Sequence, residues 1–272
     1  MDSVEVELVE LKTSGDRGAR GGDKSRWVKE LEEALLDGRA DLAVHSAKDV
    51  PGDLPAGLRI VGVPERADAR DAVCGAAGVE AIPEGAVVGT SSLRRRSQLL
   101  AARPDLAIED MRGNVDTRLR KLRERQYDAI VIARAGLDRL GVDEGEPVEP
   151  ATLTPAPGQG CLALEARSDD EEVAQLAEAI TDRRALVELT AERSAVSMLD
   201  ATCHTPVGAH ARLDGHVLTL EGFAGLPDGS TWIRDRVEGD ASDPSALGRE
   251  LGDRMLAAGA GALLAQAEIS GP

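Results

Sequence analysis

The stretch from residue 87 to residue 133 most constrains the fold, because it alternates short apolar runs with helix-like runs. The apolar runs lie at 87–89, 106–110 and 128–133, and the helix-like runs lie at 93–102 and 114–125. Alternation of strands and helices predicts an α/β fold with mainly parallel sheets. Ligands in such folds bind at the carboxyl ends of strands, so the turns at 89–92 and 112–114 are candidate binding sites.

Further elements are predicted on both sides of this stretch. They are a strand at 4–11, a helix at 27–36, a short strand at 41–45, a Pro- and Gly-rich connector at 147–160, helices at about 171–180 and 184–199, three strands between 206 and 237, and a helix at about 244–266. Pro51 prevents a long helix after the short strand. The block from 206 onward is typical of a small α+β domain.

The length and charge of the chain limit what it can be. Its 272 residues suffice for two or three domains, and a net charge of −17 argues against a nucleic-acid partner. No apolar run reaches the length of a membrane span, and the N-terminus has no signal-peptide pattern. We therefore expect a cytoplasmic protein with no membrane partner.

The acidic composition has two interpretations. The 32 basic residues include only five lysines, and the aromatic residues number only four. This pattern is typical of proteins from a high-salt cytoplasm, where salt screens the self-repulsion of the chain. The alternative is an ordinary acidic protein from a GC-rich genome. In either case, the arginines at 94–96, 112 and 118 are locally concentrated against a negative background.

Three cysteines lie far apart in the sequence, without metal-ligand spacing. Cys74 and Cys161 lie in apolar, strand-like contexts and are predicted to be core residues. Cys203 follows a helix-like run and lies in a short turn before Pro206, where a thiol could carry a covalent group. A lone cysteine is nevertheless more often an inert small hydrophobe. The sequence predicts no metal site.

The turn at residues 90–92 combines groups that hold carboxylates. Thr90, Ser91 and Ser92 lead into a helix that begins with Arg94 and Arg95. Backbone N–H groups and hydroxyls at a helix start bind anions, and arginines add bidentate partners. The alternative is an ordinary helix cap with arginines that face solvent.

The segment from His45 to Pro51 repeats the strand-to-turn pattern and adds a carboxylate, Asp49. A carboxylate can stabilise positive charge on a substrate and shuttle a proton. The alternative is an aspartate that caps the turn before Val50 and Pro51, and the residues alone favour this structural role.

Four segments in this order resemble the porphobilinogen deaminase (hydroxymethylbilane synthase) family. They are His45-Ser46-Ala47-Lys48-Asp49-Val50-Pro51, Gly89-Thr90-Ser91-Ser92-Leu93-Arg94-Arg95-Arg96, Arg112-Gly113-Asn114-Val115-Asp116-Thr117-Arg118 and the run from Ala191 to Gly208 around Cys203. The resemblance runs over nearly the whole chain. It implies two hinged domains like those of periplasmic binding proteins, plus a small α+β C-terminal domain. The implied domains are 1–64 with 161–180, 69–155, and 183–272, the last carrying the cysteine.

The resemblance also implies an activity. The family joins four porphobilinogen units head to tail, releases ammonia each time, and yields hydroxymethylbilane. The primer is a dipyrromethane cofactor held by a thioether, which the resemblance places at Cys203, with Asp49 as the catalytic carboxylate. A monomer with porphobilinogen as its small-molecule partner is implied.

The implied cofactor- and substrate-binding residues are Lys24, Ser46, Lys48, Thr90, Ser91, Ser92, Arg94, Arg95, Arg112, Arg118, Arg139 and Gln159. Trp27 takes the place of a ring-stacking Phe, or it is a core anchor at a helix start. Arg118 and Arg120 cannot face the same way on a helix, so Arg118 is assigned to the site and Arg120 to the surface.

The chain departs from the family pattern in one respect. Family members usually begin with an Arg-x-Ser-x-Leu-Ala segment before the part that resembles residues 4–11, and the printed sequence has none. We therefore expect an incomplete first domain. Two alternatives follow for function: a non-catalytic binding module for an acidic small molecule, or an inactive truncated form.

Overall fold

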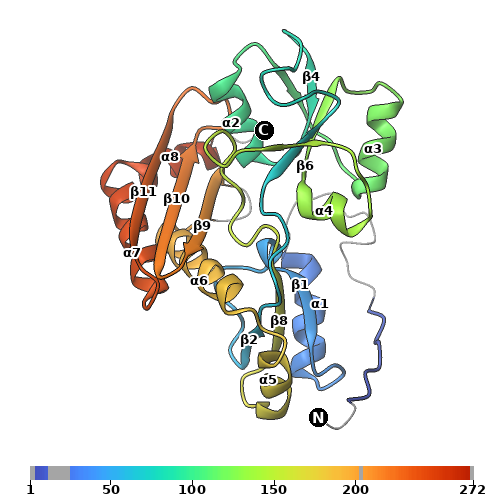
Figure 1. Cartoon of the computed structure of the whole chain (residues 1–272), viewed down its shortest axis with the longest axis vertical. Coiled ribbons are helices and arrows are strands. Elements are labelled where there is room, and N and C mark those ends of the chain that lie inside the picture. Colours follow the sequence, from blue (N-terminus) through green and yellow to red (C-terminus); the bar gives the residue numbers. More distant parts are fainter. Residues whose placement is uncertain (1–3, 12–24, 202–204, 270–272) are drawn as a thin grey trace.

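The computed structural model describes residues 4–11, 25–201 and 205–269, with the backbone alone for residues 25–27. Figure 1 shows three bodies, each built around its own β-sheet. We call them the N-terminal lobe, the central lobe and the C-terminal lobe. The predicted α/β fold with a small α+β C-terminal unit is confirmed. The residue numbers of the predicted domain boundaries stay a prediction.

The N-terminal lobe is a three-stranded antiparallel sheet in the order β1-β8-β2, with Ala43 opposite Glu165 and Leu58 opposite Arg167. Its elements are α1 (Ser25–Leu36), β1 (Ala43–Ser46), the 3₁₀ turn η2 (Ala47–Asp49), β2 (Leu58–Gly62), β8 (Leu162–Arg167) and α5 (Glu171–Glu178). The helix predicted at 27–36 is confirmed, and the short strand ends in the expected turn before Pro51.

The central lobe is a five-stranded sheet in the order β5-β4-β6-β3-β7. Its elements are β3 (Asp71–Cys74), β4 (Val87–Gly89), α2 (Leu93–Ala102), β5 (Ala107–Glu109), α3 (Val115–Arg123), β6 (Ala129–Ala133), α4 (Arg134–Arg139) and β7 (Glu146–Val148). Every residue of β6 is buried, and alternate residues join two different apolar clusters. Both faces of this sheet are therefore covered, as is typical of α/β folds.

The prediction of mainly parallel sheets is wrong. Among the described strands, only β4–β5 and β4–β6 are parallel. β3 runs antiparallel to both of its neighbours, and the strands of the N-terminal sheet are antiparallel as well. The alternating pattern identifies strands and helices but not their direction. Direction here follows from the two long connections, since the chain leaves the N-terminal lobe after β2 and returns at β8.

The C-terminal lobe packs helices on one antiparallel sheet, in the order β11-β10-β9. Its elements are α6 (Arg183–Met198), β9 (Val207–Asp214), β10 (Val217–Gly225), β11 (Trp232–Asp240), α7 (Pro244–Ala257) and α8 (Ala260–Ile269). The single helix predicted at 244–266 is in fact two helices. They are separated at Gly259, whose φ of 102° is a helix-ending conformation that glycine adopts at little cost.

The strand predicted at residues 4–11 is absent, because the backbone there has no regular structure. Its apolar side chains are exposed, with Leu8 at 89% and Val6 at 76%. Alternation of apolar and acidic residues produces a strand only where a neighbouring strand pairs with it. The described residues give this segment no such partner. None of the described helices combines the length and apolar character needed to span a bilayer.

Candidate functional site

The turn between β4 and α2 uses its hydroxyl groups to build structure. Ser92 caps α2, since its side chain accepts a hydrogen bond from the Arg95 backbone N–H at 3.4 Å. The Ser91 hydroxyl donates to the Met111 carbonyl at 2.7 Å and accepts from the Met111 N–H at 3.1 Å. Thr90 is buried. This turn is therefore fixed, and Ser91 joins it to the neighbouring turn after β5.

Arg94 and Arg95 are buried, not solvent-facing. The Arg94 guanidinium donates to Asp71 Oδ2 at 2.7 Å and to the Thr154 carbonyl at 2.6 Å. Arg95 donates to Asp71 Oδ1 through two nitrogens, at 3.0 and 2.8 Å, and to the Val131 carbonyl at 3.0 Å. The carboxylate that these arginines hold in the structure is thus one of the chain itself, and their predicted role toward a ligand stays a prediction.

Asp71 is the buried centre of this cluster, with no exposed surface. Gln159, also fully buried, donates a third hydrogen bond to Asp71 Oδ1 at 2.8 Å. Burial by itself raises the pKa of the Asp71 carboxyl, but Arg94 and Arg95 outweigh burial and hold it well below its usual range. Asp71 is therefore ionised near neutral pH, and it joins the central lobe to the segment returning to β8.

The turn between β5 and α3 also starts a helix with a side-chain cap, but its arginines do not surround a buried carboxylate of the described residues. Asn114 caps α3, and its side chain accepts from the Thr117 N–H at 2.9 Å. Gly113 has a φ of 121°, and a Cβ there would lie 2.6 Å from the Thr117 side chain, so glycine is required. Arg112 is exposed. The Arg118 side chain donates to the Gly113 carbonyl at 2.7 Å.

Arg118 carries a charge that no carboxylate of the described residues compensates. Burial lowers the pKa of its guanidinium, and the nearby Arg95 lowers it further. Arg120 by contrast is exposed and pairs with Glu124 at 2.8 Å. The predicted separation of Arg118 and Arg120 onto different helix faces is confirmed. Positive charge therefore gathers on the side of α3 that faces Arg95.

The turn after β1 carries Ser46, Lys48 and Asp49. Ser46 is the last residue of β1, and the Ala47 N–H bonds the Cys161 carbonyl at 3.0 Å, which fixes the start of the turn. Ser46, Lys48 and Asp49 are all half-buried. The carboxylate is thus held on a short structured turn at the carboxyl end of a strand.

The turn from Pro157 to Cys161 connects the N-terminal and central groups. Gln159 reaches Asp71 of the central cluster, and Cys161 holds the start of the Asp49 turn. Arg139, from the end of α4, donates to the Gly160 carbonyl at 2.9 Å. Two of the weaker predicted site residues, Arg139 and Gln159, are therefore brought together here, in roles that shape the backbone.

Two predicted residues, Cys203 and Lys24, lie outside the described residues, as does the Trp27 side chain. Cys74 and Cys161 are buried free thiols, as predicted. Burial raises the pKa of Cys74 to about 11 and that of Cys161 to about 12, so neither is a nucleophile near neutral pH. Within the described residues, no group of three or more His, Cys, Asp or Glu side chains could hold a metal ion.

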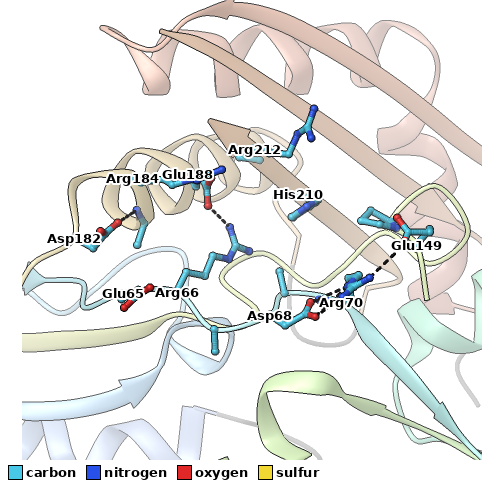
Figure 2. A pocket seen from close by; sticks show the side chains of 15 residues that line it. Glu65, Arg66, Asp68, Arg70, Glu149, Asp182, Arg184, Glu188, His210 and Arg212 are labelled. Carbon is cyan, nitrogen blue, oxygen red and sulfur yellow. Dashed lines mark hydrogen bonds and ion pairs between the residues drawn. The ribbon is translucent and has the colours of Figure 1, made fainter. Parts of the chain in front are cut away.

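A second charged cluster, which the sequence did not reveal, lies where the three lobes meet. Arg66 donates to Glu192 at 2.8 and 3.2 Å and to Glu188 at 3.3 Å, so it ties the crossover after β2 to α6. Arg66 and Glu188 line a cavity of about 610 Å³. Figure 2 shows both side chains there, with Arg70 bonded to Asp68 and Glu149 on its other side. None of the predicted site residues lines this cavity.

One signal could have found the missed residues. Glu165 lies inside the apolar run 161–166, and Asp71 stands directly before the apolar run 72–74. Charged residues are almost never fully buried unless they are paired, so a charge inside an apolar run predicts a buried partner. Finding that partner requires the fold, because Asp71 and Arg94 are 23 residues apart and Arg66 and Glu192 are 126 apart.

The α/β fold places the exposed Arg112 and the half-buried Arg118 just after the carboxyl end of β5, where ligands bind in such folds. A family model described as "Porphobilinogen deaminase, dipyromethane cofactor binding domain" matches residues 1–175, and one described as "Porphobilinogen deaminase, C-terminal domain" matches residues 186–257. The chain therefore belongs to the porphobilinogen deaminase family.

Curated relatives agree with this assignment. The porphobilinogen deaminase of Roseiflexus sp. (strain RS-1) is 53% identical over 90% of this chain and 82% of its own length. Those of Deinococcus radiodurans and Thermus thermophilus are 47% and 46% identical, over 96% and 97% of this chain and 88% and 89% of their own lengths. The alternative of a non-catalytic binding module is not favoured by these matches.

Solved structures of binding proteins also align with parts of the chain. A periplasmic sulfonate-binding protein from Methylobacillus flagellatus KT aligns over 62% of this chain and 51% of its own, with 14% identity and a TM-score of 0.33. A substrate-binding domain of an amino acid transporter from Streptococcus pneumoniae aligns over 56% of this chain and 69% of its own. Its sequence identity is 14% and the TM-score is 0.37. TM-scores this low do not establish a shared fold, so the hinge between the lobes stays a prediction.

Proposed function

We propose that this chain joins four porphobilinogen units head to tail, with release of ammonia at each addition, to give hydroxymethylbilane. The primer is a dipyrromethane held through Cys203. The observation that carries the proposal is the convergence of two groups on the turn from Pro157 to Cys161, in a chain of this family. One group is the Asp49 turn, and the other is the Asp71 cluster with the arginines of the turn after β4, which Ser91 joins to the turn after β5.

The residues present fit a carboxylate-bearing cofactor and substrate. Each pyrrole carries an acetate and a propionate, which require hydrogen-bonding cations. Arg112 is exposed, and the half-buried Arg118 has only a backbone carbonyl as its hydrogen-bond partner among the described residues. A ligand carboxylate beside Arg118 would compensate a charge that the chain leaves uncompensated. The bound dipyrromethane supplies a nucleophilic pyrrole carbon.

Asp49 is assigned to the reacting pyrrole of the substrate. Loss of ammonia leaves positive charge on that ring, and a carboxylate beside the ring N–H stabilises the charge as it develops. The same carboxylate can hold a proton at Oδ while the ring gives one up. Its place on a short 3₁₀ turn before Pro51 restricts its position, which such a role requires.

The setting of the reaction is also part of the proposal. We infer a monomer that acts on free porphobilinogen in the cytoplasm, without a nucleic-acid or membrane partner. The net charge of −17 opposes binding to nucleic acid, and the two described cysteines are free thiols, as is usual in a reducing compartment. Gel filtration coupled to light scattering tests the oligomeric state.

Intact mass spectrometry tests the function. The purified chain should exceed its sequence mass by one dipyrromethane, and porphobilinogen should add further pyrrole units. Cys203→Ser should abolish the increment, whereas Cys74→Ser should keep it. An adduct that maps to Cys74 or Cys161, or a wild-type chain with neither increment nor turnover, would contradict the proposal.

A further inference from the structure

The Asp49 turn rests on one face of α6, the helix that leads toward Cys203. Ala47 and Val50, on either side of Lys48 and Asp49, are buried in one apolar cluster with Ala185 and Leu189 of α6. Residues 185 and 189 are four apart, so they lie on the same face of the helix. The turn is therefore packed against α6 over one helical turn.

Arg193 continues this face by a further turn and binds the backbone just beyond Asp49. Its guanidinium donates to the Val50 carbonyl at 3.3 Å, to the Pro51 carbonyl at 2.7 Å and to the Gly52 carbonyl at 2.8 Å. Three successive carbonyls are thus held by one side chain. The contacts join residues 141 to 143 apart in sequence.

Partial burial of the Arg193 guanidinium costs desolvation free energy, which its hydrogen bonds to the turn offset. Burial lowers the pKa of the Arg193 guanidinium, opposed by the charges of Asp53 and Glu165. Within the described residues its hydrogen bonds go to carbonyls alone, and it forms no ion pair. A guanidinium cannot lose its proton in a protein, so this half-buried cation relies on the three carbonyls and on the nearby negative charges.

The next face of α6 performs a different task. Glu188 and Glu192 bind Arg66. Their carboxylates also accept hydrogen bonds from the backbone N–H groups of Gly158, Ala211 and Leu213. That face holds the crossover and the C-terminal sheet, whereas the face of Arg193 holds the Asp49 turn. α6 therefore contacts the Asp49 turn along one side, and Arg193 precedes Cys203 by ten residues in the sequence.

We propose that Arg193 is a positioning residue, which clamps the carbonyls of residues 50–52 to α6 and so fixes the Asp49 carboxylate relative to the cofactor attached at Cys203. This inference rests on the proposed function. Arg193 touches neither ring nor reacting atom in this assignment. It acts through the backbone of the turn, and its loss should affect the rate of chain growth more than the binding of substrate.

The test compares three variants in the full-length holoenzyme. Arg193→Met keeps the apolar stem and removes all three hydrogen bonds, and Arg193→Lys keeps the charge with fewer donors in the right geometry. The matched control is Arg183→Met, which removes an exposed arginine of the same helix that has no hydrogen bond or ion pair within the described residues. Hydrogen exchange is followed in peptides covering residues 46–54, together with intact mass, kcat and KM.

We expect Arg193→Met to speed exchange in 46–54 and to lower kcat by about 10- to 100-fold, with KM and the cofactor increment little changed. Arg193→Lys should fall between this variant and wild type, and Arg183→Met should match wild type. Unchanged exchange in 46–54, or faster exchange with unchanged kcat, would overturn the proposal. Loss of the cofactor increment would overturn it too, because Arg193 would then belong to the cofactor site.

Failure of the proposed function has a different signature. In that case wild type itself shows neither increment nor turnover. The exchange measurement still reports whether the clamp exists, since it requires no activity.

Discussion

The turns after β4 and β5 begin with the same local design and end in different states. Each follows a short parallel strand, starts a helix with a side-chain cap, and carries arginines at the helix start. At the first turn Arg94 and Arg95 are buried around Asp71. At the second, Arg112 is exposed and Arg118 has a backbone carbonyl as its partner. One aspartate on β3, which β6 separates from β4 in the sheet, accounts for the difference.

The comparison shows that an arginine-rich helix start is not by itself a ligand site. At the first turn the arginines bind groups of the protein itself. They and Asp71 join β3 and α2 to the returning segment at Thr154 and Gln159. At the second turn no carboxylate of the described residues pairs with Arg118, so its charge is left for the carboxylate of a ligand. We therefore expect changes at the first turn to cost stability, and changes at the second to cost function.

The largest effect should follow from Asp71→Ala. It leaves two buried guanidinium groups without their anion, and breaking such a buried cluster costs about 3–5 kcal/mol. Urea denaturation of the variant should show a loss of that size in the free energy of unfolding. Glu124→Gln, which removes only the exposed partner of Arg120, is the control and should lie within about 0.5 kcal/mol of wild type. A loss below about 1 kcal/mol for Asp71→Ala would remove the distinction between the two turns.

Arg118→Ala should give the reverse pattern. A charge-assisted hydrogen bond to a ligand carboxylate is worth about 1.5–3 kcal/mol, so kcat/KM should fall about 10- to 100-fold. The free energy of unfolding should change by less than about 1 kcal/mol. Arg120→Ala, on the opposite side of α3, should leave both quantities near wild type. Equal losses of activity at Arg118 and Arg120 would contradict the assignment of faces.

Lowering the pH should reduce the free energy of unfolding through the first turn, by a smaller amount than the substitutions above. The pKa of Asp71 is lowered in the folded chain, whereas an unfolded Asp has a pKa of about 3.9. Its contribution to stability is therefore complete above about pH 4 and is lost as pH falls through the lowered folded value. Stability measured against pH should fall more steeply below pH 4 in wild type than in Asp71→Asn. Parallel curves would show that Asp71 has an ordinary pKa.

Salt should have the smallest effect, and the same one on both turns. Because the chain carries a net charge of −17, screening by molar KCl should raise the thermal midpoint. Wild type and Arg118→Ala should rise alike, since the effect comes from the whole chain. A midpoint that does not depend on KCl would contradict the expectation of a high-salt protein.

Local sequence determined much of this protein. The helix at 93–102, its cap at Ser92 and the cap at Asn114 follow from residues within one or two turns of each other. Cys74 and Cys161 were predicted as core because they sit in apolar runs. The order of four short segments was enough to indicate the family. Helix caps, turns and apolar periodicity are local, so a sequence displays them directly.

The tertiary structure alone decided what the charges do. It placed Asp71 between Arg94 and Arg95, set Arg193 on three carbonyls about 140 residues away, and ran β3 and β8 antiparallel to their neighbours. It also gave residues 4–11 no strand, although their pattern alternates. The physical reason is the same in each case. A buried charge or a strand edge takes its state from partners distant in sequence, and only folding brings those partners within hydrogen-bond distance.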